Sequence, residues 1–271
     1  MRFYPRFHSG TFIPGKDTDM IRVLLSGCNG HMGQVLTDLM EADSDVETVA
    51  GIDIAPDAAV RKYPVFATPD ACTVDADVCI DFSNFHAVPA LLSYCTKKKL
   101  PLVLCTTGLT DEILAQVKEA SAQTAILRSA NMSLGINLLM KVLKEAAKTL
   151  APAGYDMEIV EAHHNRKLDA PSGTALALGE SMNEALDGQY HFVFSRHDRT
   201  EKRDPKEIGI SSVRGGTIVG IHDVMFAGQD EVIEFRHTAY SRAIFGNGAI
   251  QAAKFLAGKP AGMYDMADVI G

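Results

Sequence analysis

The chain has 271 residues, 46% hydrophobic and 22% charged, which is ordinary for a globular protein with one large domain or two smaller ones. Its 26 basic and 34 acidic residues give a formal net charge of −8, which argues against a general nucleic-acid-binding role. No apolar run reaches the roughly 20 residues of a membrane-spanning helix. The five cysteines form no CxxC pair, so we expect a cytoplasmic protein without a disulfide framework or a zinc site.

Residues 1–19 differ from the rest of the chain. They have no periodic apolar pattern and no long apolar run of the kind found in a secretory signal. A clear strand pattern begins at Met20. We therefore expect residues 1–19 to be an N-terminal extension. It is either foreign to the native protein or a native arm that docks on a neighbouring subunit, and the sequence leaves both open.

Residues 20–132 show strands that alternate with helices. Short apolar runs predict the strands, and apolar residues at helical spacing predict the helices between them. The predicted strands span residues 21–25, 46–54, 77–81, 102–105 and 124–127, and the predicted helices span 34–42, 86–98 and 111–122. This alternation predicts an α/β fold with a Rossmann-type doubly wound parallel sheet.

The pattern changes after residue 133, where strands follow one another without intervening helices. The predicted strands span residues 157–162, 191–194, 208–213, 217–226 and 231–238, and the predicted helices span 137–150, 173–186 and 245–256. They predict a second, α+β domain with a mixed or antiparallel sheet, and we expect the last helix to pack back on the first domain. The expected units are the extension 1–19, a dinucleotide-binding domain at 20–132 and 241–271, and a second domain at 133–240.

Three glycines, Gly27, Gly30 and Gly33, lie between the first predicted strand and the first predicted helix. Glycines at this place let the backbone turn tightly and let a pyrophosphate approach the N-terminus of the helix. Their spacing, GxxGxxG, differs by one residue from the usual GxGxxG. Asp53 follows Gly33 by twenty positions, at the end of the second predicted strand, where a carboxylate accepts hydrogen bonds from ribose hydroxyls. These features predict a site for NADH or NADPH; a tight turn without a ligand is the alternative.

The residues around Asp53 bear on the choice between the two cofactors. Ile54 follows it, and nothing adjacent is suited to pair with a 2′-phosphate. NADH is therefore mildly favoured over NADPH. Arg61 and Lys62 are the nearby cations that keep NADPH open.

Two later loops also follow strands of the first predicted sheet. One is Cys-Thr-Thr-Gly at residues 105–108, and the other is Ser-Ala-Asn-Met-Ser at residues 129–133. Ligands of doubly wound sheets bind at the carboxyl ends of the strands, so we expect both loops to contact the nicotinamide half of the cofactor. Ordinary connecting loops are the alternative.

The most polar stretch of the chain is EAHHNRKLDAPSGTA at residues 161–175, between an apolar strand and an apolar helix. Histidine titrates near neutral pH, and lysine attracts anions and donates protons. A helix that begins near Ser172 offers free N–H groups to a carboxylate. The stretch therefore predicts a site that binds an anion and moves a proton. A metal site is not expected, because neighbouring strand residues point to opposite faces and there is no HExxH pattern.

Together these motifs resemble the 4-hydroxy-tetrahydrodipicolinate reductase family, also called dihydrodipicolinate reductases, from residue 20 to the C-terminus. The resemblance rests on GCNGHMG at 27–33, CTTG at 105–108, SANMSLGIN at 129–137, EAHHNRKLDAPSGTA at 161–175, RGGTIVGIH at 214–222 and HTAYSR at 237–242. The run at 161–175 is the most specific of them.

The resemblance implies an activity and an assembly. The activity is NAD(P)H-dependent reduction of 4-hydroxy-tetrahydrodipicolinate, a cyclic dicarboxylate, to tetrahydrodipicolinate with loss of water. This is a step of the diaminopimelate pathway of lysine biosynthesis. The implied assembly is a homotetramer built through the second domain, which also binds the substrate.

The resemblance also implies site residues. His163 is the implied proton donor and acceptor, Lys167 a proton donor and His164 a substrate-binding residue, while Gly173 and Thr174 hold a substrate carboxylate. The implied cofactor contacts are Gly27, Cys28, Asn29, Gly30, His31, Met32, Asp53, Cys105, Thr106, Thr107, Ser129, Ala130, Asn131, Met132, Arg242 and Phe245.

Some residues depart from the family pattern or are expected outside the site. Cys105 stands where many members carry glycine, and we assign it no redox role. Ile54 stands where some members carry arginine. Arg166 is expected at the surface or an interface rather than on a ligand, and His222 and His237 are expected to have structural roles in their strands.

Two other functions remain open. One is a related Rossmann enzyme that acts on a different small acid, such as an amino-acid dehydrogenase, but it would need a different motif at residues 161–175. The other is a non-catalytic NAD-dependent sensor, but it would be expected to lack His163 or Lys167, and both are present.

Overall fold

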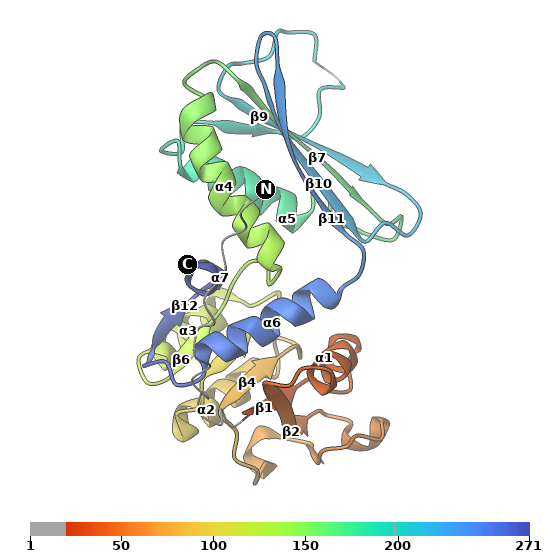
Figure 1. The fold of residues 1–271 in the computed structure, drawn as a ribbon, viewed down its shortest axis with the longest axis vertical. Helices are drawn as coiled ribbons and strands as arrows, with labels where there is room; N and C mark the ends of the chain where they lie inside the picture. The colour runs from red at the N-terminus through yellow and green to blue at the C-terminus, as the bar shows by residue number, and fades with distance from the viewer. Residues whose placement is uncertain (1–19, 198) are drawn as a thin grey trace, which may run out of the picture.

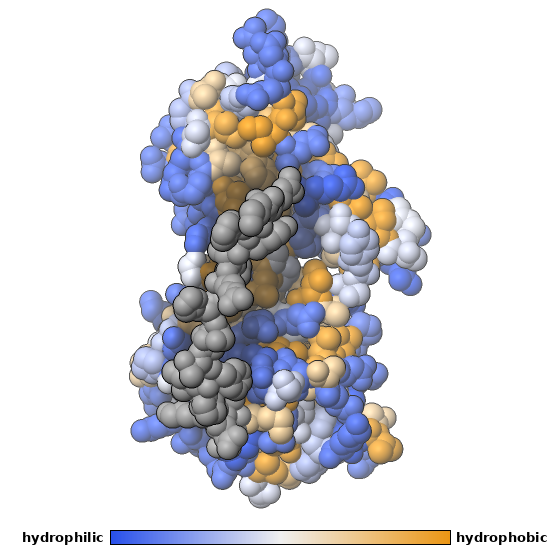
Figure 2. All heavy atoms as spheres, in the orientation of Figure 1, coloured by the Kyte–Doolittle hydropathy of each residue, from blue (hydrophilic) through white to orange (hydrophobic). Residues whose placement is uncertain are grey.

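The computed structural model describes residues 20–197 and 199–271, so the expected extension at residues 1–19 lies outside the described residues. The elements gather around two sheets at opposite ends of an elongated molecule (Figure 1). The molecule narrows between the two ends, and polar and apolar side chains intermix over both of them on the face shown in Figure 2. In the described part of the chain, no helix is long and apolar enough to cross a membrane.

The first sheet has seven strands in the order β12-β6-β5-β4-β1-β2-β3, and every neighbouring pair is parallel. Its strands are β1 (Ile21–Ser26), β2 (Val46–Ile52), β3 (Val65–Phe66), β4 (Val78–Asp81), β5 (Leu102–Leu104), β6 (Ala125–Leu127) and β12 (Gly262–Tyr264). Helices α1 (His31–Glu41) and α6 (Ala243–Leu256) cover one face, and α2 (Val88–Lys98) and α3 (Asp111–Ser121) cover the other. The central strands are mainly apolar because both of their faces are covered.

Helix α6 returns from the second sheet and packs against α1 and strands β4 to β6, as the sequence predicted (Figure 1). Its close approach depends on Gly248, where an added Cβ would lie 1.6 Å from the carbonyl oxygen of Met132. The returning helix therefore supports the loop after β6 directly.

The second sheet has five strands in the order β11-β10-β7-β9-β8. They are β7 (Asp156–His163), β8 (His191–Val193), β9 (Glu207–Arg214), β10 (Gly220–Ala227) and β11 (Val232–Ala239). The sheet is mixed, because β10 pairs antiparallel with β7 and β11, whereas β9 pairs parallel with β7 and β8. Helices α4 (Leu134–Leu150) and α5 (Gly173–Glu184) cover one face, and no helix of residues 20–197 and 199–271 lies on the other (Figure 1). The predicted fold class is therefore confirmed in both parts.

The short elements were not predicted. They are β3, β12, the terminal helix α7 (Met266–Ile270) and two 3₁₀ turns, Pro56–Ala58 and Pro69–Ala71. None is long enough to show a period. The start of α4 also differs from the prediction: it begins three residues earlier, at Leu134, because the hydroxyl of Ser133 accepts a hydrogen bond from the N–H of Ile136 and caps the helix.

Candidate functional site

The glycines of the first turn have three different physical roles. Gly27 has a φ of +77°, and an added Cβ would lie 2.6 Å from the carbonyl oxygen of Phe82. A Cβ on Gly33 would lie 2.3 Å from the carbonyl oxygen of Gly27, so Gly33 lets α1 pack closely on the turn. Gly30 is exposed, has an ordinary φ of −70° and precedes α1 without a side-chain cap. No acidic residue lies in the first turn of α1, so its N-terminus suits a phosphate group.

Asp53 lies just beyond the end of β2 and faces this turn. One of its carboxylate oxygens accepts a hydrogen bond from the N–H of Asn29 at 3.0 Å, and the other accepts one from the N–H of Ala55 at 3.0 Å. Arg61 also reaches the turn, donating to the carbonyl of Cys28 at 2.6 Å and to the side-chain oxygen of Asn29 at 3.1 Å. The structure thus joins the glycine turn and the expected ribose-binding carboxylate.

A cavity of about 750 Å³ opens between the turn, the end of β2 and the start of α2. Gly27, Gly30 and Asp53 line it, as do Ser83 and Asn84 after β4. An uncapped helix N-terminus on one side and a carboxylate on the other suit the pyrophosphate and ribose of a dinucleotide. The residues present therefore fit the cofactor that the sequence predicts.

The other expected cofactor residues differ in what they present to this site. Cys28 and Met132 are buried in the core of the sheet, which leaves their backbone as the part that faces the loops. His31 and Met32 form the first turn of α1, Thr107 and Ala130 are exposed, and Ser129 is half-buried. Arg242 is exposed before α6, and Phe245 packs partly into the core.

The loop after β5 is anchored by a buried carboxylate that the sequence reading did not identify. The hydroxyl of Thr106 donates to Asp81 at 2.6 Å, and Asp81 ends β4 with no exposed surface. Burial raises the pKa of Asp81, despite hydrogen bonds from Ser83, Thr106 and Ser26. Burial and the nearby Asp81 also raise the pKa of the Cys105 thiol well above its usual range, so this thiol is neutral and poorly nucleophilic.

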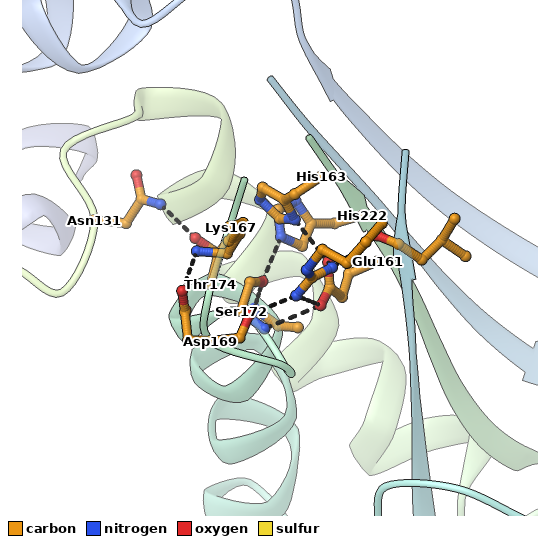
Figure 3. Close-up of polar contacts among 11 residues, drawn as sticks. Asn131, Glu161, His163, Lys167, Asp169, Ser172, Thr174 and His222 are labelled. Atoms are coloured by element: carbon orange, nitrogen blue, oxygen red, sulfur yellow. Dashed lines mark hydrogen bonds and ion pairs between the residues drawn. The ribbon is translucent and has the colours of Figure 1, made fainter. Parts of the chain in front are cut away.

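The polar stretch begins on β7, where alternate residues face the covered side of the sheet. Met157 and Ile159 occupy that side, and Glu161 and His163 continue it. Two apolar positions are thus followed by two polar ones on the same face, at the end of the strand beside α5 (Figure 3). Nδ1 of His163 lies 2.6 Å from a carboxylate oxygen of Glu161, and neither side chain is more than 11% exposed.

Glu161 also receives a two-pronged ion pair from Arg214, at 2.7 and 2.8 Å. Burial tends to raise the pKa of Glu161, but Arg214, Ser212, His163 and the N–H of Ser172 outweigh it and lower the pKa to about 2. Glu161 and Arg214 were not among the expected site residues. The signal available in the sequence was the spacing of Glu161 and His163, which places both on one face of a strand.

Helix α5 begins beside this pair. The hydroxyl of Ser172 accepts a hydrogen bond from the N–H of Ala175 at 3.1 Å, as expected for a cap. The side chain of Thr174 accepts a hydrogen bond from Asn131 at 3.0 Å. This contact brings the loop after β6, an expected cofactor loop, against the expected carboxylate-binding turn (Figure 3).

Lys167 and His164 lie on the loop that leads to α5. Nζ of Lys167 is 2.9 Å from Asp169, and the pKa of Asp169 is lowered mainly by this partner. The pKa of His164 is lowered first by burial and then by nearby basic side chains, Arg166, Arg242, His163 and Lys167. Arg166, Arg242 and Lys167 thus place positive charge around His164, which suits an anionic ligand. Arg166 itself is exposed, as expected.

The sequence predicted only a structural role for His222, on β10, but the structure places it beside the expected site. Its Nε2 lies 3.1 Å from the hydroxyl of Ser172, and its ring centroid is 5.2 Å from that of His163. Burial, followed by the neighbouring His163 and His237, lowers the pKa of His222 to about 4, so it is neutral near pH 7. His237 is partly buried on β11, and burial lowers its pKa as well. Within the described ranges, no three His, Cys, Asp or Glu side chains form a group that could hold a metal ion.

Comparison with known proteins shows the family. A family model described as "Dihydrodipicolinate reductase, N-terminus" matches residues 21–132, and one described as "Dihydrodipicolinate reductase, C-terminus" matches residues 135–270. A curated 4-hydroxy-tetrahydrodipicolinate reductase from Caldanaerobacter subterraneus subsp. tengcongensis is 50% identical over 251 residues, covering 93% of this chain and 98% of the relative. The Clostridium tetani protein of the same name is 46% identical over 247 residues, covering 91% of this chain and 96% of the relative.

Solved structures agree with this match. The dipicolinate-bound dihydrodipicolinate reductase from Paenisporosarcina sp. TG-14 has a TM-score of 0.78 and 26% identity, and the match covers 93% of this chain and 100% of that one. The C. glutamicum DAP dehydrogenase in complex with DAP shares the fold, with a TM-score of 0.56 and 15% identity, and the match covers 93% of this chain and 95% of that one. The resemblance read from the sequence motifs is therefore confirmed. The chain belongs to the dihydrodipicolinate reductase family of nicotinamide-dependent oxidoreductases.

Proposed function

We propose that the protein reduces 4-hydroxy-tetrahydrodipicolinate to tetrahydrodipicolinate with loss of water, in the diaminopimelate pathway of lysine biosynthesis. Family membership supports the reaction, and the dipicolinate-bound relative supports a small cyclic dicarboxylate as the substrate. The observation that carries the proposal is the hydrogen bond from Asn131 to Thr174. It brings the loop assigned to the cofactor within one side-chain contact of the turn assigned to the substrate.

The substrate's carboxylate has a natural partner in the N-terminus of α5. The N–H of Ser172 is taken by Glu161 and that of Ala175 by the Ser172 hydroxyl. Among the hydrogen bonds of residues 20–197 and 199–271, none uses the N–H groups of Gly173 or Thr174. These two groups, with the helix dipole behind them, are the proposed carboxylate site. The cationic side chains of Arg166, Arg242 and Lys167 near His164 also favour binding of a dicarboxylate.

The bound nicotinamide cofactor supplies the hydride. In the proposed arrangement, the glycine turn holds the pyrophosphate, Asp53 holds the adenosine ribose, and the loops at residues 105–107 and 129–132 border the nicotinamide. Arg242 and Phe245 border it from the start of α6. Thr106 is fixed by Asp81 and Asn131 by Thr174, so both loops are held in place by side chains as well as by the backbone.

His163 and Lys167 deliver the proton in this proposal. Negative charge develops on the ring as it is reduced, and a cationic group beside it stabilises that charge and donates the proton. Nζ of Lys167 exchanges its contact with Asp169 for one with the substrate. Nε2 of His163 faces away from Glu161, because Nδ1 is the atom in contact with that carboxylate.

A coupled assay tests the proposed function. Freshly made dihydrodipicolinate synthase product is added to the protein, and the oxidation of NADH and of NADPH is followed separately. We expect oxidation that depends on both the synthase product and the protein. Folded protein that oxidises neither cofactor with this substrate would contradict the proposal.

We also propose that both cofactors are used, with NADH mildly favoured. The Asp53 carboxylate opposes a 2′-phosphate, whereas Arg61, already at the glycine turn, offsets part of that charge. Lys62 instead pairs with Glu41 at 2.8 Å in this structure. We expect Asp53→Ala to raise KM for NADH by about ten-fold, roughly the loss of one hydrogen bond to a charged group, and to raise KM for NADPH less. Steady-state kinetics with each cofactor give the ratio, and an equal rise in both KM values would remove the assigned role of Asp53.

The proposed units are a dinucleotide-binding domain at residues 20–132 and 241–271 and a substrate-binding and oligomerisation domain at 133–240, in a cytoplasmic homotetramer. The face of the second sheet opposite α4 and α5 supports the assembly, because no helix in the described part of the chain covers it (Figure 1). Val160, Ile221 and Met225 lie on this face in the central strands β7 and β10 and are half-buried even in one chain.

Val160→Lys tests the assembly. In one chain the new lysine stands opposite Asp223, its partner in the register of β7 and β10, so the monomer tolerates it. Between copies the contact would have to bury this lysine and the Asp223 beside it, and taking both charges out of water costs free energy. We expect light scattering to give four times the 29.3 kDa chain mass for the parent protein and a smaller assembly for the variant. A parent protein that is monomeric at micromolar concentration would contradict the proposal.

A further inference from the structure

Glu161 lies at the centre of the polar site without reaching the proposed substrate position itself. We infer that Glu161, with Arg214 as its counter-ion, is a positioning residue that fixes His163, the start of α5 and the loop carrying Lys167 in one arrangement. The inference rests on the proposed function and names the residue that organises its proton-delivering side (Figure 3).

The first contact fixes the tautomer of His163. An ionised carboxylate only accepts hydrogen bonds, so at 2.6 Å from Glu161 the Nδ1 atom of His163 must carry the hydrogen. Nε2 is then the atom left for the reaction. An added Cβ on Gly220 would lie 3.2 Å from Nε2, so the small residue at this position of β10 keeps the atom accessible.

The second contact fixes the start of α5. The N–H of Ser172 donates to the other oxygen of Glu161 at 3.1 Å. The hydroxyl of the same serine caps α5 and lies 3.1 Å from Nε2 of His222. The turn that presents Gly173 and Thr174 is therefore attached to the same carboxylate as His163.

The third contact runs through Arg214. Besides both oxygens of Glu161, its guanidinium donates to the carbonyl of Asp169 at 2.6 Å. The side chain of Asp169 in turn holds Lys167. One buried ion pair thus connects the strand that bears His163 to the loop that bears Lys167.

Stability alone does not account for this pair. Replacing a buried ion pair by well-packed apolar residues of the same volume is often neutral or stabilising. Glu161 has no exposed surface and its pKa is about 2, held there by Arg214 and the other donors against the effect of burial. The charged carboxylate of Glu161 instead orients the groups around it, because it accepts hydrogen bonds from four donors at once.

Glu161→Gln is the sharpest test, because a glutamine has the same shape but one acceptor oxygen. Whichever way its amide is turned, the NH₂ group faces Arg214 and either His163 or Ser172. We expect kcat to fall about 100-fold, the cost of misplacing a catalytic group by about 1 Å, with KM for NADH unchanged. We also expect the imidazole ¹⁵N spectrum of His163 to lose its single Nδ1–H form, the resonance being assigned by its absence in His163→Asn.

Glu207→Gln is the matched control. Glu207 is 1% exposed, pairs with Arg196 and starts β9 in the same sheet, but it does not contact the site. We expect the control to lose stability without losing kcat or changing the His163 spectrum. The inference is overturned if Glu161→Gln keeps the parent kcat and spectrum, or if both variants lose kcat equally.

A second variant covers a failure of Glu161→Gln to fold. Glu161→Asp keeps the charge beside Arg214 but is one methylene too short to hold all four donors. We expect it to fold with reduced kcat, and parent-like kcat would overturn the inference. The ¹⁵N spectrum of His163 can be recorded without turnover. A parent protein that is inactive on the proposed substrate would therefore contradict the proposed function, while the effect of Glu161 on the tautomer of His163 could still be tested.

Discussion

Lys167→Ala is expected to lower kcat by about 10²- to 10⁴-fold, the range typical of a lost general acid. Lys167 also balances Asp169 at 2.9 Å, so its removal leaves an unpaired carboxylate facing the substrate's own negative charge. NADH binding is expected to stay the same, because the glycine turn and Asp53 belong to the other sheet. Single-turnover kinetics measure the loss, and fluorescence titration measures the NADH affinity.

Lys148→Ala is the matched control for this variant. Lys148 pairs with Glu145 at the same distance, 2.9 Å, but lies on the outer surface of α4. An exposed pair of this kind contributes about 0–1 kcal/mol to stability, so we expect parent-like turnover. Lys167→Ala with turnover equal to that of the control would remove Lys167 from the proton-delivery step.

Gly27→Ala is expected to destabilise the fold strongly as well as to abolish NADH binding. A side chain at a φ of +77° costs about 1–2 kcal/mol, and a Cβ forced to within 2.6 Å of a backbone oxygen costs about 1–3 kcal/mol more. Together these are a large share of the roughly 5–15 kcal/mol that stabilises a typical native protein. Urea unfolding without cofactor measures the loss, and NADH titration of the remaining folded protein measures the affinity.

Gly30→Ala separates binding from folding in the same turn. Its backbone is ordinary, and an added Cβ would lie 3.3 Å from the nearest atom, the carbonyl oxygen of Gly27. We expect nearly parent-like stability but weaker NADH binding, because the methyl group occupies the space over the N-terminus of α1. If Gly30→Ala bound NADH as the parent does, the pyrophosphate would not lie over this turn.

The sequence predicted the helices and strands well where they are long. Strands β1 and β4 are mainly apolar runs, and α1 and α4 repeat apolar residues at helical spacing, so local composition shows their type. The sequence did not predict β3 and β12, which are two and three residues long and form only because a neighbouring strand pairs with them. Sheet pairing of such short segments depends on contacts between distant parts of the chain.

The candidate site, too, could be predicted from the sequence only in part. His163, Lys167 and the Ser-Gly-Thr turn were identified from one continuous stretch, because chemically distinctive residues lie close together in it. Arg214 was missed: it lies 53 positions from Glu161 and reaches it only through the parallel pairing of β7 and β9. Asp81 was missed for the same reason, because its partner Thr106 lies 25 positions away in the loop after β5.

By itself, the sequence determined the two-part α/β plan, the glycine turn and the family, because each depends on spacing within a short segment. Only the tertiary structure decided which residues meet. Asn131 reaches Thr174 across 43 positions, and Glu161 collects four donors from β7, β9 and the start of α5. A buried carboxylate stays ionised only where the fold gathers enough donors around it, and a sequence pattern does not contain that arrangement.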